Sequence, residues 1–178
     1  MSSIACVPAE IAEVFIPFDV KCAAEIVFID RSVAETDPSH RQIIPYVAVR
    51  RSRDGKFLVY DRAGSEQRLH GLSSIGIGGH VDHPETWQDA LYREMREEAG
   101  ITIYHKWHLG KILLSDSLVN QVHMGLCFLV ETQDAWPGEE LQNARWLSLS
   151  DIKNLTLEAW SIELIDMVER FERKRAKA

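Results

Sequence analysis

The chain has 178 residues, a length that fits one domain with a buried core and a short N-terminal extension. Its 46% apolar and 26% charged residues are typical of a globular protein, and no apolar run reaches the roughly 18 residues that cross a bilayer. We therefore expect no membrane contact. The net charge of −7 argues against a nucleic-acid partner, because such proteins usually carry a basic balance.

The cysteines and the N-terminus indicate where the protein works. The three cysteines, Cys6, Cys22 and Cys127, are odd in number and none are spaced as C-x-x-C, which predicts neither a disulfide framework nor a zinc knuckle. The first ten residues lack a basic stretch followed by a long apolar one, so we see no secretion signal. We expect a cytoplasmic protein.

The hydrophobic pattern predicts an α/β (α+β) domain with a mixed sheet and helices packed on it. Residues 1–20 give no clear prediction, and residues 31–41 and 63–69 are expected to be loops. Helices are expected at 86–99 and 157–171. The expected strands, in chain order, are residues 25–30, 43–50, 56–60, 74–77, 102–114, 122–131 and 144–147. We expect residues 1–40 to be an N-terminal extension packed on a domain of residues 41–178.

The helix at 86–99 has good ends but a conflict on its surface. Thr86 and Asp89 suit a capping box, and Gly100 suits the residue after the helix end. At about 100° per residue, Glu94 and Glu98 fall inside the apolar stripe and Glu97 lies at its edge. Like charges at this spacing repel one another. A hard divalent cation would resolve the conflict; so would a solvated helix end neutralised by neighbouring arginines.

The segment around this helix resembles the Nudix box, G-x5-E-x7-R-E-U-x-E-E-x-G-U, where U is apolar. All nine defined positions match, without departure. They are Gly79, Glu85, Arg93, Glu94, Met95, Glu97, Glu98, Gly100 and Ile101. The chain is thus similar to Nudix hydrolases, which implies an α/β/α sandwich around a mixed sheet and a metal-dependent pyrophosphohydrolase.

The resemblance also implies a role for each polar residue of the box. Glu97 and Glu98 would be the principal ligands of Mg²⁺ (or Mn²⁺), and Glu94 would help to bind metal or activate water. Gly79 would let the backbone approach the metal, with its carbonyl as a ligand. The remaining two residues would support these groups: Arg93 would orient a catalytic glutamate, and Glu85 would brace the loop.

Several residues outside the box have two interpretations. Arg62, Arg68 and His70 could contact substrate phosphates or be plain surface residues. Glu139 and Glu140 follow a Pro-Gly turn, and they are either solvated charges or include a loop base, as in some Nudix enzymes.

Aromatic and histidine side chains leave further alternatives. Tyr46 and Trp146 could stack on a base or pack in the core. His80 and His83 are spaced H-x-x-H, as are His105 and His108. Without a third ligand signature a zinc site is not expected, although His80 and His83 could line a pocket.

The resemblance leaves the substrate open. The first hypothesis is a nucleoside diphosphate linked to another moiety. The alternatives are a house-cleaning nucleoside triphosphate pyrophosphohydrolase and a non-catalytic Nudix-like ligand-sensing domain. An isomerase of the same fold needs a cysteine in an early strand, and these cysteines are poorly placed for it. The length of the N-terminal extension favours a linked substrate and a homodimer.

Overall fold

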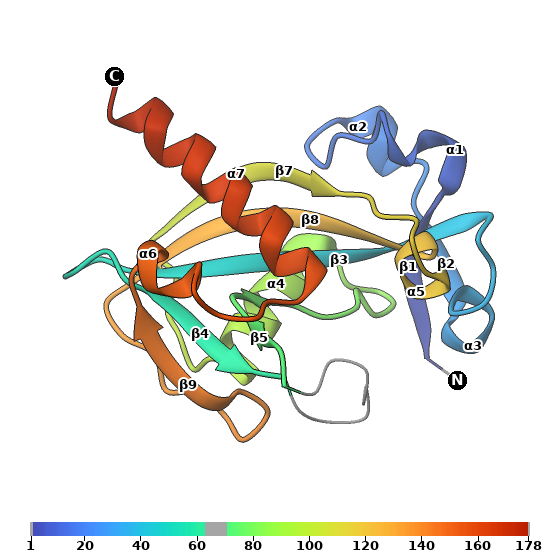
Figure 1. Ribbon diagram of the computed structural model, residues 1–178. Coiled ribbons are helices and arrows are strands. Elements are labelled where there is room, and N and C mark those ends of the chain that lie inside the picture. Colours follow the sequence, from blue (N-terminus) through green and yellow to red (C-terminus); the bar gives the residue numbers. More distant parts are fainter. Residues whose placement is uncertain (1, 63–70, 178) are drawn as a thin grey trace. The chain divides into compact units, whose positions relative to one another are not determined.

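The computed structural model describes residues 2–62 and 71–177 (Figure 1). Within them, nine strands belong to one sheet with the order β2-β1-β3-β4-β5; β6 and β8 also pair with β3, β7 with β8, and β9 with β4. The chain falls into two compact units. Unit 1 comprises Met1–Pro45, Gly79–Leu91 and Lys111–Leu126, and unit 2 comprises Tyr46–Gly78, Tyr92–Gly110 and Cys127–Ala178.

Unit 1 is built around a strand that the sequence did not predict. Strand β1 (Ser3–Pro8) runs antiparallel to β2 (Val27–Asp30) and to the first residues of β3 (His40–Arg51). Ile4 and Cys6 of β1 are fully buried against Ala34, and Ile29 packs on them. Four short helices complete the unit: α1 (Ala9–Ala12), α2 (Val20–Ala23), α3 (Arg31–Ala34) and α5 (Leu118–Gln121).

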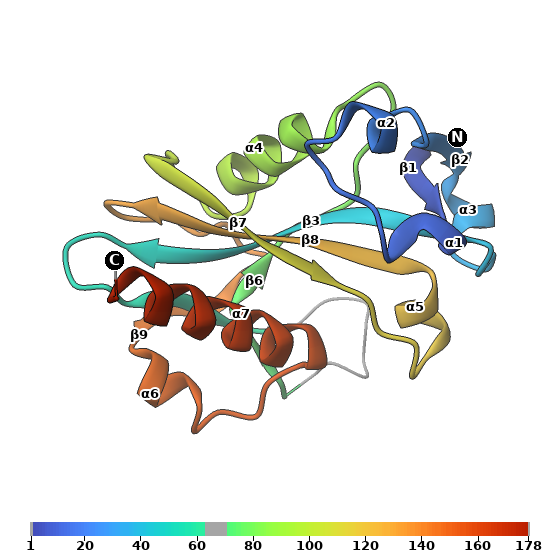
Figure 2. The same cartoon turned by 90° about the horizontal axis from the view of Figure 1, so that it is seen from above.

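Unit 2 contains the second part of β3 and the strands that pair with it. A turn at Gly55 leads from β3 into β4, and Gly55 adopts a φ of 69° that favours glycine. Helix α7 (Ala159–Arg175) lies along β7 (Figure 2), where Phe171 contacts Trp107. The other elements here are β4 (Phe57–Asp61), β5 (Ser73–Ser74), β6 (Gly76–Ile77), β9 (Gln142–Leu147) and α6 (Leu149–Ile152).

Strand directions confirm the predicted mixed sheet. The amide of Gln42 donates to Val122 O, and the amide of Ser52 donates to Thr132 O. The two partners advance together along the chain, so β3 runs parallel to β8 (His123–Thr132). Its pairing with β4 is antiparallel, so parallel and antiparallel pairs occur in one sheet. The last strand, β7 (His105–Ile112), pairs with β8.

Helix α4 (Trp87–Glu97) begins and ends as the sequence predicts. The Thr86 amide donates to Asp89 Oδ2 at 3.0 Å, and the Asp89 amide donates to Thr86 Oγ1 at 3.2 Å, which is the expected capping box. Gly100 has a φ of 59°, and a Cβ there would lie 2.5 Å from the carbonyl oxygen of Trp136. Only glycine fits this position without strain.

Two expectations about local structure are wrong. Residues 31–41 were expected to form a loop, but they contain α3, because Asp30 caps it by accepting from the Ser32 amide at 3.0 Å. Residues 74–77 were expected to form one strand, but they split between β5 and β6, and each piece pairs with a different strand. One turn of helix and a two-residue strand are too short to give a periodic pattern.

Candidate active site

The last turn of α4 places two of the box carboxylates among arginines. Glu94 is buried, with 7% of its surface exposed, and it accepts a hydrogen bond from Arg93 Nη1 at 2.5 Å. Glu97 is 55% exposed and lies 3.3 Å from Arg96 Nη2 and 4.0 Å from Arg93 Nη1. Each of these two carboxylates thus has an arginine beside it, but Glu97 is exposed whereas Glu94 is buried.

Glu98 has a different environment. The pKa of Glu98 is raised to about 8, first by burial and then by the charge of Glu94, a hydrogen bond with Glu94 and the charge of Glu140, while the charge of Arg62 opposes the shift. Two carboxylates that share a hydrogen bond cannot both be charged without cost. Glu94, which is buried, and Glu98, which is half-buried, therefore form a carboxylate pair that interacts unfavourably when both groups are charged.

Arg62 points inward, toward a network of hydroxyl groups. Its Nη1 donates to the Tyr60 hydroxyl at 3.3 Å, and Tyr60 donates to the carbonyl oxygen of Gly76 at 2.8 Å. Burial would lower the pKa of Arg62, but Tyr60 and the Glu158 carboxylate raise it above its usual value. This guanidinium thus lies in the field of both Glu158 and Glu98.

Glu158 is a buried carboxylate that the sequence analysis did not identify. Its Oε1 accepts from the hydroxyls of Tyr46 at 2.7 Å, Ser74 at 2.5 Å and Ser161 at 3.2 Å. The ring of Tyr46 meets that of Trp160 edge-on, with centroids 5.3 Å apart. Tyr46 is therefore a core residue with a satisfied hydroxyl, which favours core packing over base stacking. Trp146, the other stacking candidate, has the Arg51 guanidinium 4.6 Å from its ring centroid.

The loop before β9 is fixed to the end of α4. The amide of Trp136 donates to Ala99 O at 2.9 Å, and that of Gly138 donates to Glu98 O at 2.8 Å. Glu139 and Glu140 follow directly and are exposed. Because Glu140 acts electrostatically on Glu98, it lies within range of the carboxylate pair. Arg68 and His70, the other predicted phosphate contacts, lie outside the described residues.

In unit 1, the first part of the box makes its own set of contacts. Glu85 Oε2 accepts from the Asp82 amide at 3.2 Å, a contact suited to bracing the loop. His80 Nε2 lies 2.8 Å from Gln42 Oε1. Burial, followed by the charges of Arg31 and His123, lowers the pKa of His80 to about 4. His83 instead packs edge-on against Phe28, so the two histidines have separate partners.

Comparison with known proteins identifies the family. The family model described as NUDIX domain matches residues 41–168. The chain belongs to the Nudix hydrolases. It is 30% identical to Protein YmaB of Bacillus subtilis over 162 residues, which cover 78% of this chain and 76% of that protein. It is 28% identical to the chloroplastic Nudix hydrolase 21 of Arabidopsis thaliana over 130 residues, with 71% of this chain matched and 65% of the relative's length spanned.

Solved Nudix structures share the fold. The crystal structure of Tm1382 superimposes with a TM-score of 0.77 and 24% identity, covering 96% of this chain and 98% of the other. The NUDIX domain of Shewanella oneidensis NrtR, crystallised with ADP ribose, gives a TM-score of 0.62 and 15% identity, covering 73% of this chain and 87% of that domain. The predicted fold class and the predicted enzyme class, a hydrolase acting on pyrophosphate bonds, are both confirmed.

The box of this Nudix hydrolase can be compared with the needs of a divalent cation. Across residues 2–62 and 71–177, no three His, Cys, Asp or Glu side chains are grouped closely enough to hold a metal ion. Glu94 and Glu98 share a hydrogen bond, and carboxylate oxygens suit Mg²⁺ or Mn²⁺. Glu97 is exposed and forms ion pairs with Arg96 and Arg93. The chemistry of these carboxylates therefore suits a hard divalent cation.

The described helices carry no membrane signal. None of them is long and apolar enough to cross a bilayer.

Proposed function

We propose that this Nudix hydrolase cleaves the phosphoanhydride bond of a nucleoside diphosphate linked to another moiety, with Mg²⁺ (or Mn²⁺) as its cofactor. The observation that carries the proposal is the Glu94–Glu98 pair at the end of α4, in which Glu94 is buried and Glu98 half-buried. Two carboxylates held together out of water destabilise the folded protein unless a cation or a proton lies between them. The intact box around them makes the cation the better explanation.

Each residue near the pair has a task in this mechanism. A divalent cation, when bound, would polarise phosphorus and lower the pKa of the attacking water. Glu94 and Glu98 would hold it, with Glu97 and the carbonyl of Gly79 as further ligands. Arg93, which donates to Glu94, would keep that carboxylate oriented. Glu85 would brace the loop of Gly79 through the Asp82 amide.

The loop before β9 would supply the base. Glu140 acts on Glu98 electrostatically and is exposed, so its carboxylate is available to accept a proton from the attacking water. Glu139, its exposed neighbour, is the alternative base. Arg68 and His70 would bind the substrate phosphates. Arg62 would contribute to phosphate binding through its charge, because its side chain is directed toward Tyr60.

Two features support a linked nucleoside diphosphate as the substrate. The NUDIX domain of NrtR, which shares this fold, was crystallised with ADP ribose. The N-terminal extension has the length of those that build dimers in enzymes for linked substrates, so we also propose a homodimer. A nucleoside triphosphate is the second substrate class to test.

The test is a phosphate-release screen with Mg²⁺ or Mn²⁺. It covers ADP ribose, nucleotide sugars, dinucleotides and nucleoside triphosphates, and it compares wild type with Glu98→Gln. Glu25→Gln is the matched control, because Glu25 is an exposed glutamate of the extension. We expect metal-dependent turnover of a linked diphosphate in wild type and control but not in Glu98→Gln. If only nucleoside triphosphates are turned over, they are the substrate class and the linked diphosphate is wrong. Silence across the panel would favour the ligand-sensing alternative.

A further inference from the structure

The first part of the box pairs with residues that lie outside the family match. The amide of Ala5 donates to Val81 O at 2.9 Å, and the amide of His83 donates to Ser3 O at 2.9 Å. Ile4 and Asp82 form an antiparallel bridge between these bonds. The start of β1 therefore holds residues 81–83 as an additional short antiparallel partner, although β1 precedes the matched residues 41–168.

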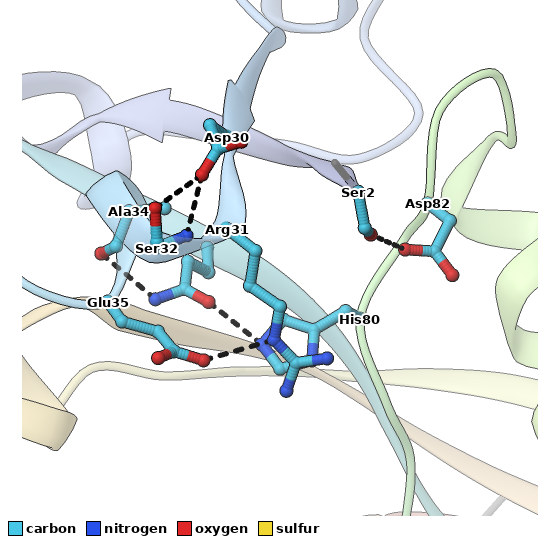
Figure 3. Close-up of polar contacts among 9 residues, drawn as sticks. Ser2, Asp30, Arg31, Ser32, Ala34, Glu35, His80 and Asp82 are labelled. Atoms are coloured by element: carbon cyan, nitrogen blue, oxygen red, sulfur yellow. Dashed lines mark hydrogen bonds and ion pairs between the residues drawn. The ribbon is translucent and has the colours of Figure 1, made fainter.

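A buried polar contact joins the same loop to α3. Gln42 is fully buried, and its Nε2 donates to Ala34 O at 3.0 Å. With its nitrogen directed to that carbonyl, the amide directs Oε1 toward His80 Nε2, 2.8 Å away. Figure 3 labels the two residues that this amide joins, Ala34 and His80. The contact therefore requires His80 to donate from Nε2. A single buried amide thus connects the backbone of α3 with the residue next to Gly79.

The acceptor carbonyl of Ala34 is itself held in place. Asp30 caps α3 by accepting from both the amide and the hydroxyl of Ser32, at 3.0 and 2.6 Å. The amide of Arg31 donates to Ser2 O at 3.0 Å, which ties α3 to β1. At the other end of the loop, Trp87 Nε1 donates to Pro17 O at 3.2 Å. The extension thus contacts both the loop and the first residue of α4.

We propose that residues 2–35 form a brace for the catalytic loop 79–85, and that Gln42 and His80 are positioning residues that lock the loop to this brace. The loop carries Gly79 and Glu85 and continues directly into α4, which ends at the carboxylate pair. A misplacement of about 1 Å in such a loop can reduce turnover on the order of 100-fold. This inference rests on the proposed function for its effect on turnover, but its structural part does not.

The brace predicts a specific pattern among variants. Gln42→Met keeps the shape of the side chain but removes the amide, and His80→Leu removes the donor. His80→Gln is the conservative variant, because its side-chain nitrogen can replace Nε2. Gln121→Met is the control, since it removes an amide of unit 1 that donates to Ser115 O and not to the loop.

Amide hydrogen exchange measures the stability of the brace and needs no substrate. We expect the amides of Ala5 and His83 to exchange at least tenfold faster in Gln42→Met and His80→Leu, and at close to the wild-type rate in His80→Gln and Gln121→Met. With the substrate found in the screen, kcat should fall at least tenfold in the first two variants while KM stays within about twofold. His80→Gln should restore both readouts.

Each other outcome overturns the brace in a distinguishable way. Unchanged exchange at Ala5 and His83 in His80→Leu would remove the proposed link, whether or not a substrate is known. Faster exchange with unchanged kcat would make the contact structural only and leave the proposed function intact. If Gln42→Met fails to fold, His80→Leu and His80→Gln still decide, because His80 is only half-buried.

Discussion

In residues 79–85 of the box, the polar groups described above have partners from the same unit: β1 bonds Val81 and His83, and Gln42 bonds His80. At the end of α4, buried Glu94 and half-buried Glu98 instead bring two carboxylates together. One motif thus contains a part whose polar groups are satisfied and a part whose charges are in conflict. The difference agrees with our proposals that the first part sets position and that the second part binds a cation.

The largest expected effect is on turnover, and it comes from removing one carboxylate of the Glu94–Glu98 pair. Glu98→Gln should reduce turnover on the order of 1,000-fold, because a carboxylate that binds the cofactor is removed. The metal-free variant should unfold at the same or a higher temperature than wild type, since the repulsion with Glu94 disappears. Phosphate release and thermal unfolding measure the two effects. A clear loss of stability would show that the pair is structural.

The next effect concerns Glu158 of unit 2, whose carboxylate has hydrogen-bond donors around it. Glu158→Leu should lower the free energy of unfolding by about 3 kcal/mol, because three hydroxyl groups lose a charged acceptor. Tyr46→Phe removes one of these bonds and should cost about 1 kcal/mol. Urea denaturation measures both. Equal losses in the two variants would contradict a network centred on Glu158.

A smaller effect comes from the end of α4. Gly100→Ala should cost about 2 kcal/mol, since alanine disfavours a φ of 59° and its Cβ would meet the carbonyl of Trp136. Gly71→Ala is a useful control, because Gly71 also has a positive φ but no atom of the described residues lies within 4 Å of its Cβ position. The difference between the two variants in urea isolates the contact with the loop before β9.

The smallest effect is a pH dependence of stability that comes from Cys6, a residue of the brace. Burial, and then the charge of Asp37, raises the pKa of the Cys6 thiol in β1 to about 12 from 9.0. Above pH 9 the unfolded chain releases this proton and the folded chain keeps it, so stability falls as pH rises. At pH 10 the loss should be about 1 kcal/mol relative to pH 8. Cys6→Ala should not show this component; an identical pH dependence in both proteins would mean that Cys6 is accessible.

Local signals made parts of the site predictable from the sequence. The capping box of Thr86 and Asp89, the turn at Gly100 and the misplaced carboxylates of α4 depend on residues within one helix. The periodicity of α7 and of the longer strands gave the α/β class. The roles of the box residues, the cofactor and the homodimer stay predictions, as does the division into residues 1–40 and 41–178.

Long-range contacts could not be predicted in the same way. Strand β1 pairs with residues 81–83, more than 70 positions away, and nothing near it in the sequence marks that partner. Glu158 reads as an ordinary charge before a helix until Tyr46 and Ser74 meet it from distant strands. Arg62 is of a residue type that commonly binds phosphate, and the sequence does not show that its side chain points toward Tyr60.

The most direct test of the central claim is a Mn²⁺ titration followed by electron paramagnetic resonance on wild type, Glu98→Gln and Glu25→Gln. We predict that wild type and Glu25→Gln bind Mn²⁺ with the same affinity, and that Glu98→Gln binds at least tenfold more weakly. Equal affinity in all three proteins would contradict the claim that the Glu94–Glu98 pair holds the catalytic metal.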